Sequence, residues 1–102
     1  MPLKRGLWLT LIDDADEAYP VACDVAERRE GAWILETMIP PQVYPVRFVA
    51  ARLRLDGNFL GLLRLPDPLQ TVTHQPLDVR LEFPIDPRRL EGTRFARAAT
   101  PR

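Results

Sequence analysis

The sequence predicts a mainly β protein: a single antiparallel small barrel or sandwich of about six strands, with a flexible Arg-rich C-terminal tail. Three observations predict this class. Eleven prolines divide the 102 residues into short segments and leave little room for long helices. Most of these segments alternate apolar and polar side chains, as half-buried strands do. The pair Asp56-Gly57 stands between two alternating segments, where a tight hairpin turn needs residues that accept positive φ.

In the N-terminal half we expect strands at residues 6–12, 19–27 and 32–39. Leucine occupies every second position of the first strand. In the second, larger apolar residues alternate with small or polar ones. A four-residue hairpin loop over residues 28–31, which ends in glycine, should join the second strand to the third.

In the C-terminal half we expect strands at residues 46–55, 58–65 and 77–83. The last is the clearest, because its apolar and charged side chains alternate without a break. Its apolar residues are Leu77, Val79, Leu81 and Phe83, and its charged residues are Asp78, Arg80 and Glu82. The stretch 66–76 is expected to be the longest loop.

Two of these segments also fit a helix. Residues 20–30 begin with Pro20, which suits the first helical position, and Gly31 could stop the helix. Apolar residues in 46–55 also recur at helical spacing. We favour strands for both, because β-branched residues and turn signals surround them.

The expected domain organisation is one antiparallel β domain over residues 1–87 and a basic tail over residues 88–102, flexible or partner-bound. The single cysteine, Cys23, cannot form an internal disulfide, which favours a reducing compartment. The apolar run 7–12 is shorter than a signal-peptide core, and no segment approaches the roughly 20 apolar residues of a membrane span. We therefore expect a cytoplasmic protein without membrane contact.

No motif of the sequence predicts catalysis, a metal or a cofactor. The chain has no serine, and its single histidine, His74, lies in the expected loop. Cys23 is expected in the core, so a nucleophile with a histidine base is not supported. One cysteine and one histidine do not make a zinc site, and the acidic run 13–17 lacks the spacing of a calcium-binding loop. We expect a protein that is not an enzyme.

The segment 58–65 predicts an interface. Leu60 and Leu62 should face away from Phe59 and Leu63, so one apolar face would remain uncovered unless a partner covers it. The expected interface residues are Leu60, Leu62 and Arg64, with Arg88, Arg89, Arg94 and Arg97 of the tail as charged anchors. The acidic run 13–17 is the expected electrostatic mate of the tail. We therefore expect a non-catalytic protein-interaction or assembly module that self-associates.

The alternative function is single-stranded nucleic-acid binding by a small β-barrel, in which arginines contact phosphates and aromatic rings stack on bases. Its expected residues are Arg47, Arg52, Arg54 and Phe48. A shift of face after Ala51 is needed to bring the three arginines together. The net charge of zero opposes this alternative, since phosphate binding depends on an excess of cations.

Overall fold

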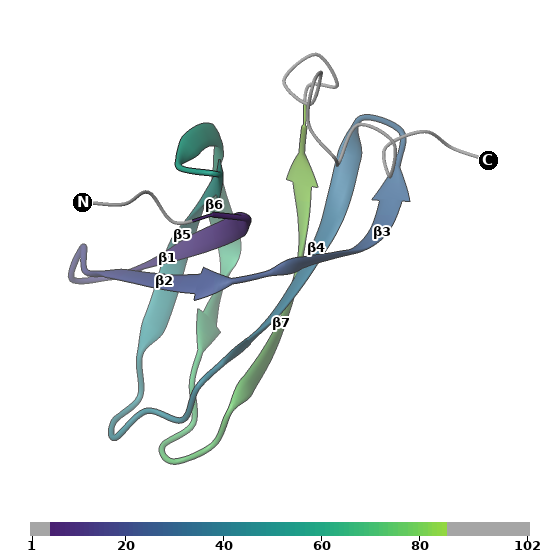
Figure 1. Cartoon of the computed structure of the whole chain (residues 1–102). Helices are drawn as coiled ribbons and strands as arrows, with labels where there is room; N and C mark the ends of the chain where they lie inside the picture. The colour runs from purple at the N-terminus through teal and green to yellow at the C-terminus, as the bar shows by residue number, and fades with distance from the viewer. Residues whose placement is uncertain (1–4, 86–102) are drawn as a thin grey trace.

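Residues 5–85, which the computed structural model describes, form seven strands in two antiparallel sheets (Figure 1). Strands account for 69% of these residues, so the expected mainly β class is confirmed. The strands are β1 (Leu7–Asp13), β2 (Ala18–Ala22), β3 (Asp24–Arg29), β4 (Ala32–Ile39), β5 (Arg47–Leu55), β6 (Asn58–Gln70) and β7 (Leu77–Pro84). The tail at 88–102 lies outside the described residues.

One sheet has the strand order β2-β1-β5-β6, and all its neighbours are antiparallel. The turn between β5 and β6 consists of Asp56 and Gly57, whose φ angles are 49° and 85°. Two successive positive φ values define the tight turn that Asp-Gly favours, so the expected hairpin is confirmed. Side chains of β5 alternate strictly over its second half, with Ala51 and Leu53 fully buried.

The other sheet has the order β3-β4-β7. Trp33 of β4 pairs with Phe83 of β7, and both side chains are buried. The alternation expected for residues 77–83 is confirmed. The turn from β3 to β4 has two residues, Glu30 and Gly31, and not the expected four.

A single hydrophobic core lies between the sheets. The fully buried Leu9, Leu11 and Leu53 come from the four-stranded sheet, and Trp33 and Phe83 come from the three-stranded sheet. Over residues 5–85 the sheets remain two separate layers and do not close into a barrel. Of the two expected architectures, this corresponds to the sandwich.

The expected strand 19–27 is wrong as a single element. The chain passes from one sheet to the other at Cys23, so that β2 pairs with β1 and β3 pairs with β4 (Figure 1). The Cys23 backbone N–H donates to the Leu7 carbonyl at 3.1 Å at this crossing. Alternation continues through the crossing, and therefore the sequence pattern did not reveal the change of partner. This is why there are seven strands and not six.

Two further expectations are corrected. The expected loop 66–76 begins later, because β6 continues to Gln70 past Pro66 and Pro68. β6 lies at the edge of its sheet, where proline removes no necessary ladder hydrogen bond. The helical alternatives for 20–30 and 46–55 are wrong, since both segments form strands.

Candidate binding face

The candidate site is the outward surface of β5 and β6 in the four-stranded sheet. Because the odd-numbered residues from Ala51 to Leu55 point into the core, Arg52 and Arg54 point outward. Across the ladder Arg52 pairs with Leu62, Arg54 pairs with Phe59, and Ala50 pairs with Arg64. We call this surface the arginine face. Its members are Arg47, Arg52, Arg54, Phe59, Leu62 and Arg64.

Arg47 belongs to this face because of a bulge. The register of β5 shifts between Phe48 and Ala50, and the inward positions on either side of the shift are Phe48 and Ala51. Arg47 therefore lies outward, on the same face as Arg52, although simple alternation would place it inward. The shift of face that would bring the three arginines together was expected after Ala51. It occurs slightly earlier, between Phe48 and Ala50.

The described residues do not neutralise the cations of the arginine face. None of its four arginines forms an ion pair with a residue in 5–85. Arg54 makes one long hydrogen bond, from Nη1 to the Gly57 carbonyl at 3.5 Å. On β1, Trp8 is the cross-strand neighbour of Arg54 and Thr10 is that of Arg52, so this neighbouring strand adds no carboxylate at these positions.

Apolar side chains accompany these cations. Leu62 is 52% exposed and Phe59 is 48% exposed. Leu60 does not share this exposure. A register shift between Leu53 and Arg54 interrupts the expected alternation, so Leu60 packs partly against the core while Phe59 lies outward. Of the expected interface residues in the described region, Leu62 and Arg64 thus lie on the arginine face.

Phe48, like Leu60, lies away from the arginine face. It is fully buried, and its ring meets that of Tyr19 edge-on, with centroids 5.3 Å apart. Arg47, Arg52 and Arg54, the other residues named for the nucleic-acid alternative, are exposed on the arginine face. The expected anchors Arg88, Arg89, Arg94 and Arg97 lie outside the described residues.

The outward surface of the three-stranded sheet has the opposite charge. By register it carries five carboxylates (Asp24, Glu27, Glu36, Asp78 and Glu82) and two arginines (Arg29 and Arg80), a balance of −3. We call it the acidic face. Glu27 accepts from Arg29 and Arg80 at 3.3 Å each, and longer contacts join Arg29 to Glu82 at 3.7 Å and Arg80 to Glu36 at 3.8 Å. Both arginines of this face are therefore paired inside the fold.

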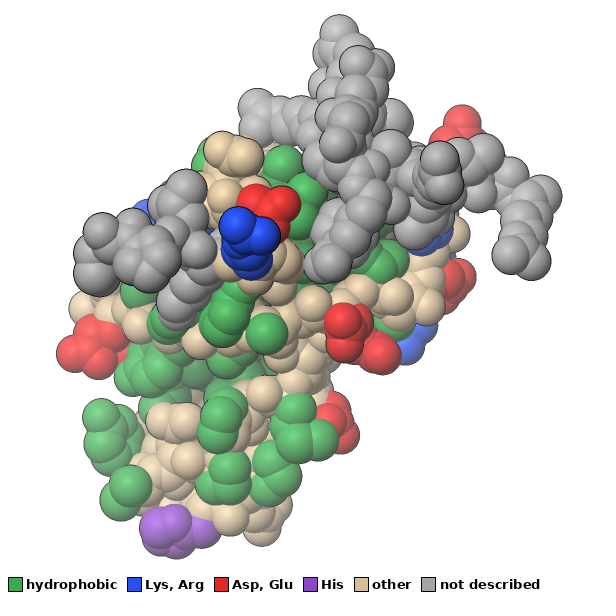
Figure 2. Space-filling view, in the orientation of Figure 1, with side chains coloured by type: hydrophobic (Ala, Val, Ile, Leu, Met, Phe, Trp, Pro, Cys, Tyr) green, Lys and Arg blue, Asp and Glu red, His purple; other side chains and the backbone are tan. Residues whose placement is uncertain are grey.

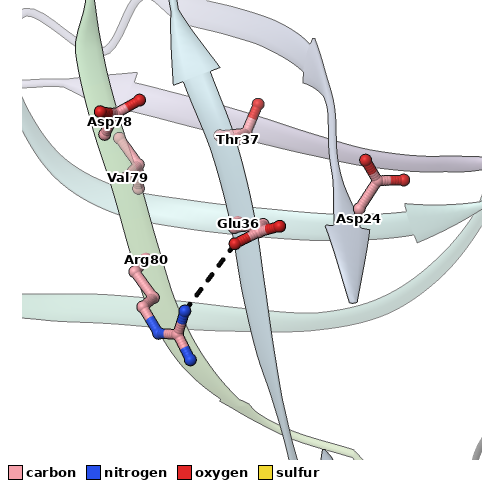
Figure 3. A pocket seen from close by; sticks show the side chains of 6 residues that line it. All are labelled: Asp24, Glu36, Thr37, Asp78, Val79 and Arg80. Atoms are coloured by element: carbon pink, nitrogen blue, oxygen red, sulfur yellow. Dashed lines mark ion pairs between the residues drawn. The ribbon is translucent and has the colours of Figure 1, made fainter. Parts of the chain in front are cut away.

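A hollow of about 500 Å³ opens at one end of this face. Its lining residues come from all three strands: Asp24 of β3, Glu36 and Thr37 of β4, and Asp78, Val79 and Arg80 of β7 (Figure 3). Asp24 and Asp78 form no ion pair with another residue in the described part of the chain. We call this site the acidic hollow. Sequence reasoning missed it because its carboxylates are separated by up to 54 positions and meet only through strand pairing.

Cys23 and His74 do not have the surroundings of a catalytic pair. Burial, and secondarily the neighbouring Asp24, raises the pKa of the Cys23 thiol to about 12, so the nucleophilic thiolate is scarce at neutral pH. His74 is an exposed loop residue with a φ of 62°, and its backbone N–H donates to the Gln42 carbonyl at 2.8 Å. Among the described residues, no three His, Cys, Asp or Glu side chains gather in a way that could hold a metal ion.

The acidic run 13–17 has a structural explanation. Asp13 is buried, and its Oδ1 accepts hydrogen bonds from the Ala15 and Glu17 backbone N–H groups at 2.9 and 2.8 Å. Asp16 supplies the positive φ of this turn. The Asp13 carboxylate thus closes the connection from β1 to β2, as Asx turns do.

A further apolar surface lies at the end of the molecule that carries His74 (Figure 2). Here the loop before β5 and the loop before β7 lie together, because Thr71 exchanges hydrogen bonds with the Val46 backbone. Exposed hydrophobic side chains on these loops are Val43, Tyr44 and Val72.

Comparisons of the chain with protein-family models, curated proteins and solved structures found no match. Within residues 5–85, no helix has the length and apolar character required to span a membrane.

Proposed function

We propose that this domain is a non-catalytic protein-interaction module that self-associates through the arginine face. The observation that carries the proposal is the set of four exposed arginines that have no ion-pair partner among residues 5–85, beside the exposed Leu62. A surface of this composition matches the centre of protein interfaces, where arginine and aromatic residues are enriched.

The contrast between the two sheets supports the proposal. On the acidic face, both Arg29 and Arg80 form ion pairs with carboxylates of the same sheet. On the arginine face, none of the residues that pair with Arg52 and Arg54 on the neighbouring strands has a carboxylate. Guanidinium groups bind carboxylates with two parallel hydrogen bonds, and another chain can provide these acceptors.

Leu62 gives this proposal a direct test. Leu62→Asp places a charge at the centre of the face without disturbing the core, because the side chain is half exposed. Sedimentation velocity should show concentration-dependent association of the wild type at low salt and a monomer for the variant. Val43→Asp, on the apolar loop end, is the matched control and should associate like the wild type. A wild type that stays monomeric at all concentrations and salt levels would contradict the proposal.

A second candidate is single-stranded nucleic-acid binding by the same face. The bulge in β5 supports it, because it adds Arg47 to Arg52 and Arg54 next to Phe59 and Trp8. Segregation of charge between the sheets also weakens the objection from the net charge of zero, since a partner meets one face at a time. Fluorescence anisotropy with a labelled oligothymidylate tests this candidate. Binding that Arg52→Gln weakens would support it, and no binding at low salt would exclude it.

The proposal includes no cofactor and no catalytic step, and it includes a cytoplasmic location. The buried, protonated Cys23 thiol is not a ready nucleophile, which supports the absence of a catalytic step. It is a free cysteine and forms no internal disulfide, which supports the cytoplasmic location.

A further inference from the structure

We infer that the arginine face binds the acidic face of a second copy of this chain, so that copies associate head to tail. This inference rests on the proposed function, and it names the partner and the surface that the partner uses.

Charge complementarity is the first argument. The arginine face carries four arginines, and the outward positions that pair with Arg52, Arg54 and Ala50 on β1 and β6 include no carboxylate. The acidic face carries a balance of −3. Pairing two arginine faces would bring two sets of like charges together, which is unfavourable across an interface. Pairing unlike faces brings cations to carboxylates.

The acidic hollow is the second argument. Asp24 and Asp78 border it without ion-pair partners in residues 5–85, and Glu36 has only a long contact with Arg80 at 3.8 Å. The hollow is open to solvent and carries carboxylates of three strands, so arginine side chains from another copy can reach these carboxylates. Thus, counting partners within the described part of the chain, carboxylates without ion pairs lie on one surface and arginines without ion pairs lie on another.

Apolar contacts can form in the same interface. Met38 is the cross-strand neighbour of Asp78 and is 58% exposed on the acidic face. Leu62 is the cross-strand neighbour of Arg52 on the arginine face. Each face therefore presents an exposed apolar side chain directly beside a charged one, which gives the contact an apolar component that salt does not screen.

The position of the two faces determines the kind of assembly. They belong to different sheets and point away from the core that the sheets share. One copy can therefore bind two neighbours, one on each face. Such a heterologous contact forms a ring when the rotation between copies closes and an open filament when it does not.

A mixing experiment with two neutralised variants tests the inference. One variant, Arg52→Gln with Arg64→Gln, loses cations of the arginine face. The other, Asp24→Asn with Asp78→Asn, loses unpaired carboxylates of the acidic hollow. Neutral replacements are chosen because reversed charges on both variants would create a new attraction. Glu30→Gln in the turn from β3 to β4 is the control for loss of a carboxylate outside the acidic hollow.

Sedimentation velocity at low salt provides the measurement, with circular dichroism and thermal unfolding to verify that each variant is folded. We expect the affinity of self-association of each variant alone to fall at least about tenfold below that of the wild type, because an interface that loses charged hydrogen bonds loses affinity. We expect an equimolar mixture of the two to form a heterodimer of about wild-type affinity, since each supplies the face that the other lacks. The Glu30→Gln control should associate like the wild type.

Other results would overturn the inference in distinguishable ways. If the Asp24/Asp78 variant associates like the wild type and the mixture forms no heterodimer, the arginine face pairs with another surface. The proposed function then survives, and the head-to-tail contact does not. If the wild type itself is monomeric, both fail, and oligonucleotide binding by that monomer would favour the second candidate.

Discussion

At the scale of single residues, Gly61 sets how closely the two sheets approach. It lies inside β6 opposite the fully buried Leu53, so its missing side chain would point into the core. A Cβ atom built there would lie 3.0 Å from Cε1 of Phe83 in the other sheet. The Phe83 ring therefore occupies the space that any larger residue at position 61 would need.

Gly61→Ala is expected to lower the free energy of unfolding by about 1–3 kcal/mol, because overpacking a tight core forces its neighbours to move. Urea denaturation monitored by circular dichroism measures the change. Leu62→Thr, which points outward on the same strand, is the control and should change stability far less. Equal stability of Gly61→Ala and the wild type would show that the Phe83 ring can move aside for the added methyl group.

Cys23 gives a second prediction at this scale. Its pKa is raised from the reference value of 9.0 to about 12, so the folded state holds its proton more tightly than the unfolded state. The Cys23 contribution to stability is therefore constant below pH 9 and is lost as the pH rises from about 9 to about 12. Stability measured against pH should fall more steeply in this range for the wild type than for Cys23→Ala. Rapid alkylation of Cys23 in the folded protein near neutral pH would contradict the assignment.

At the scale of elements, Thr71 connects the loop that precedes β5 to the segment that follows β6. The Val46 backbone N–H donates to Thr71 Oγ1 at 2.8 Å, and the Thr71 backbone N–H donates to the Val46 carbonyl at 2.9 Å. The Thr71 side chain is buried, so this pair of hydrogen bonds fixes the two loops at the end of the molecule.

Thr71→Val keeps the shape of the side chain but leaves the buried Val46 N–H without its acceptor. We expect this substitution to cost about 1–3 kcal/mol of stability, the penalty for an unsatisfied buried donor. Chemical denaturation measures the cost, and Thr73→Val is the matched control. A neutral effect of Thr71→Val would mean that water or another group replaces the hydroxyl.

Period-two alternation predicted most strands, and its failures occur where the chain departs from regular pairing. The segments 32–39 and 77–83 were expected correctly, because the inward positions of each are buried or partly buried. Alternation also placed Arg52 and Arg54 on one face. It missed the crossing at Cys23, where the partner strand changes but the pattern continues. It also misplaced Leu60, because a bulge adds one residue without any sequence signal that we recognised.

The acidic hollow could not be predicted from the sequence. Asp24, Glu36 and Asp78 belong to three strands, and only the order β3-β4-β7 brings them together. Sequence reasoning assigned the acidic partner to the run 13–17 and the basic partner to the tail at 88–102, which lies outside the described residues. Within the run, Asp13 closes a turn.

At the scale of the whole molecule, the outward faces of the two sheets carry opposite charge, although the net charge of the chain is zero. The outward arginines of β5 and β6 lie on one side of the core, and the five carboxylates of the acidic face belong to the other sheet. Such a distribution electrostatically favours contacts between unlike faces of two copies and disfavours contacts between like faces.

Self-association should therefore weaken with increasing salt, because exposed charges more than about 10 Å apart are largely screened at 0.1 M ionic strength. The apparent dissociation constant, measured by sedimentation equilibrium, should rise steadily with sodium chloride concentration. Arg52→Gln should reduce this dependence. Association that strengthens at high salt would indicate an apolar contact, such as the loop end with Val43 and Tyr44, in place of the arginine face.

The most direct test is to map the contact by two-dimensional 1H–15N NMR of the wild type at increasing protein concentration. We expect the amide signals of β5 and β6 around Arg52, Leu62 and Arg64 to shift or broaden together with those around Asp24 and Asp78. Changes confined to the loops 40–46 and 71–76, or spectra that do not depend on concentration, would contradict binding through the arginine face.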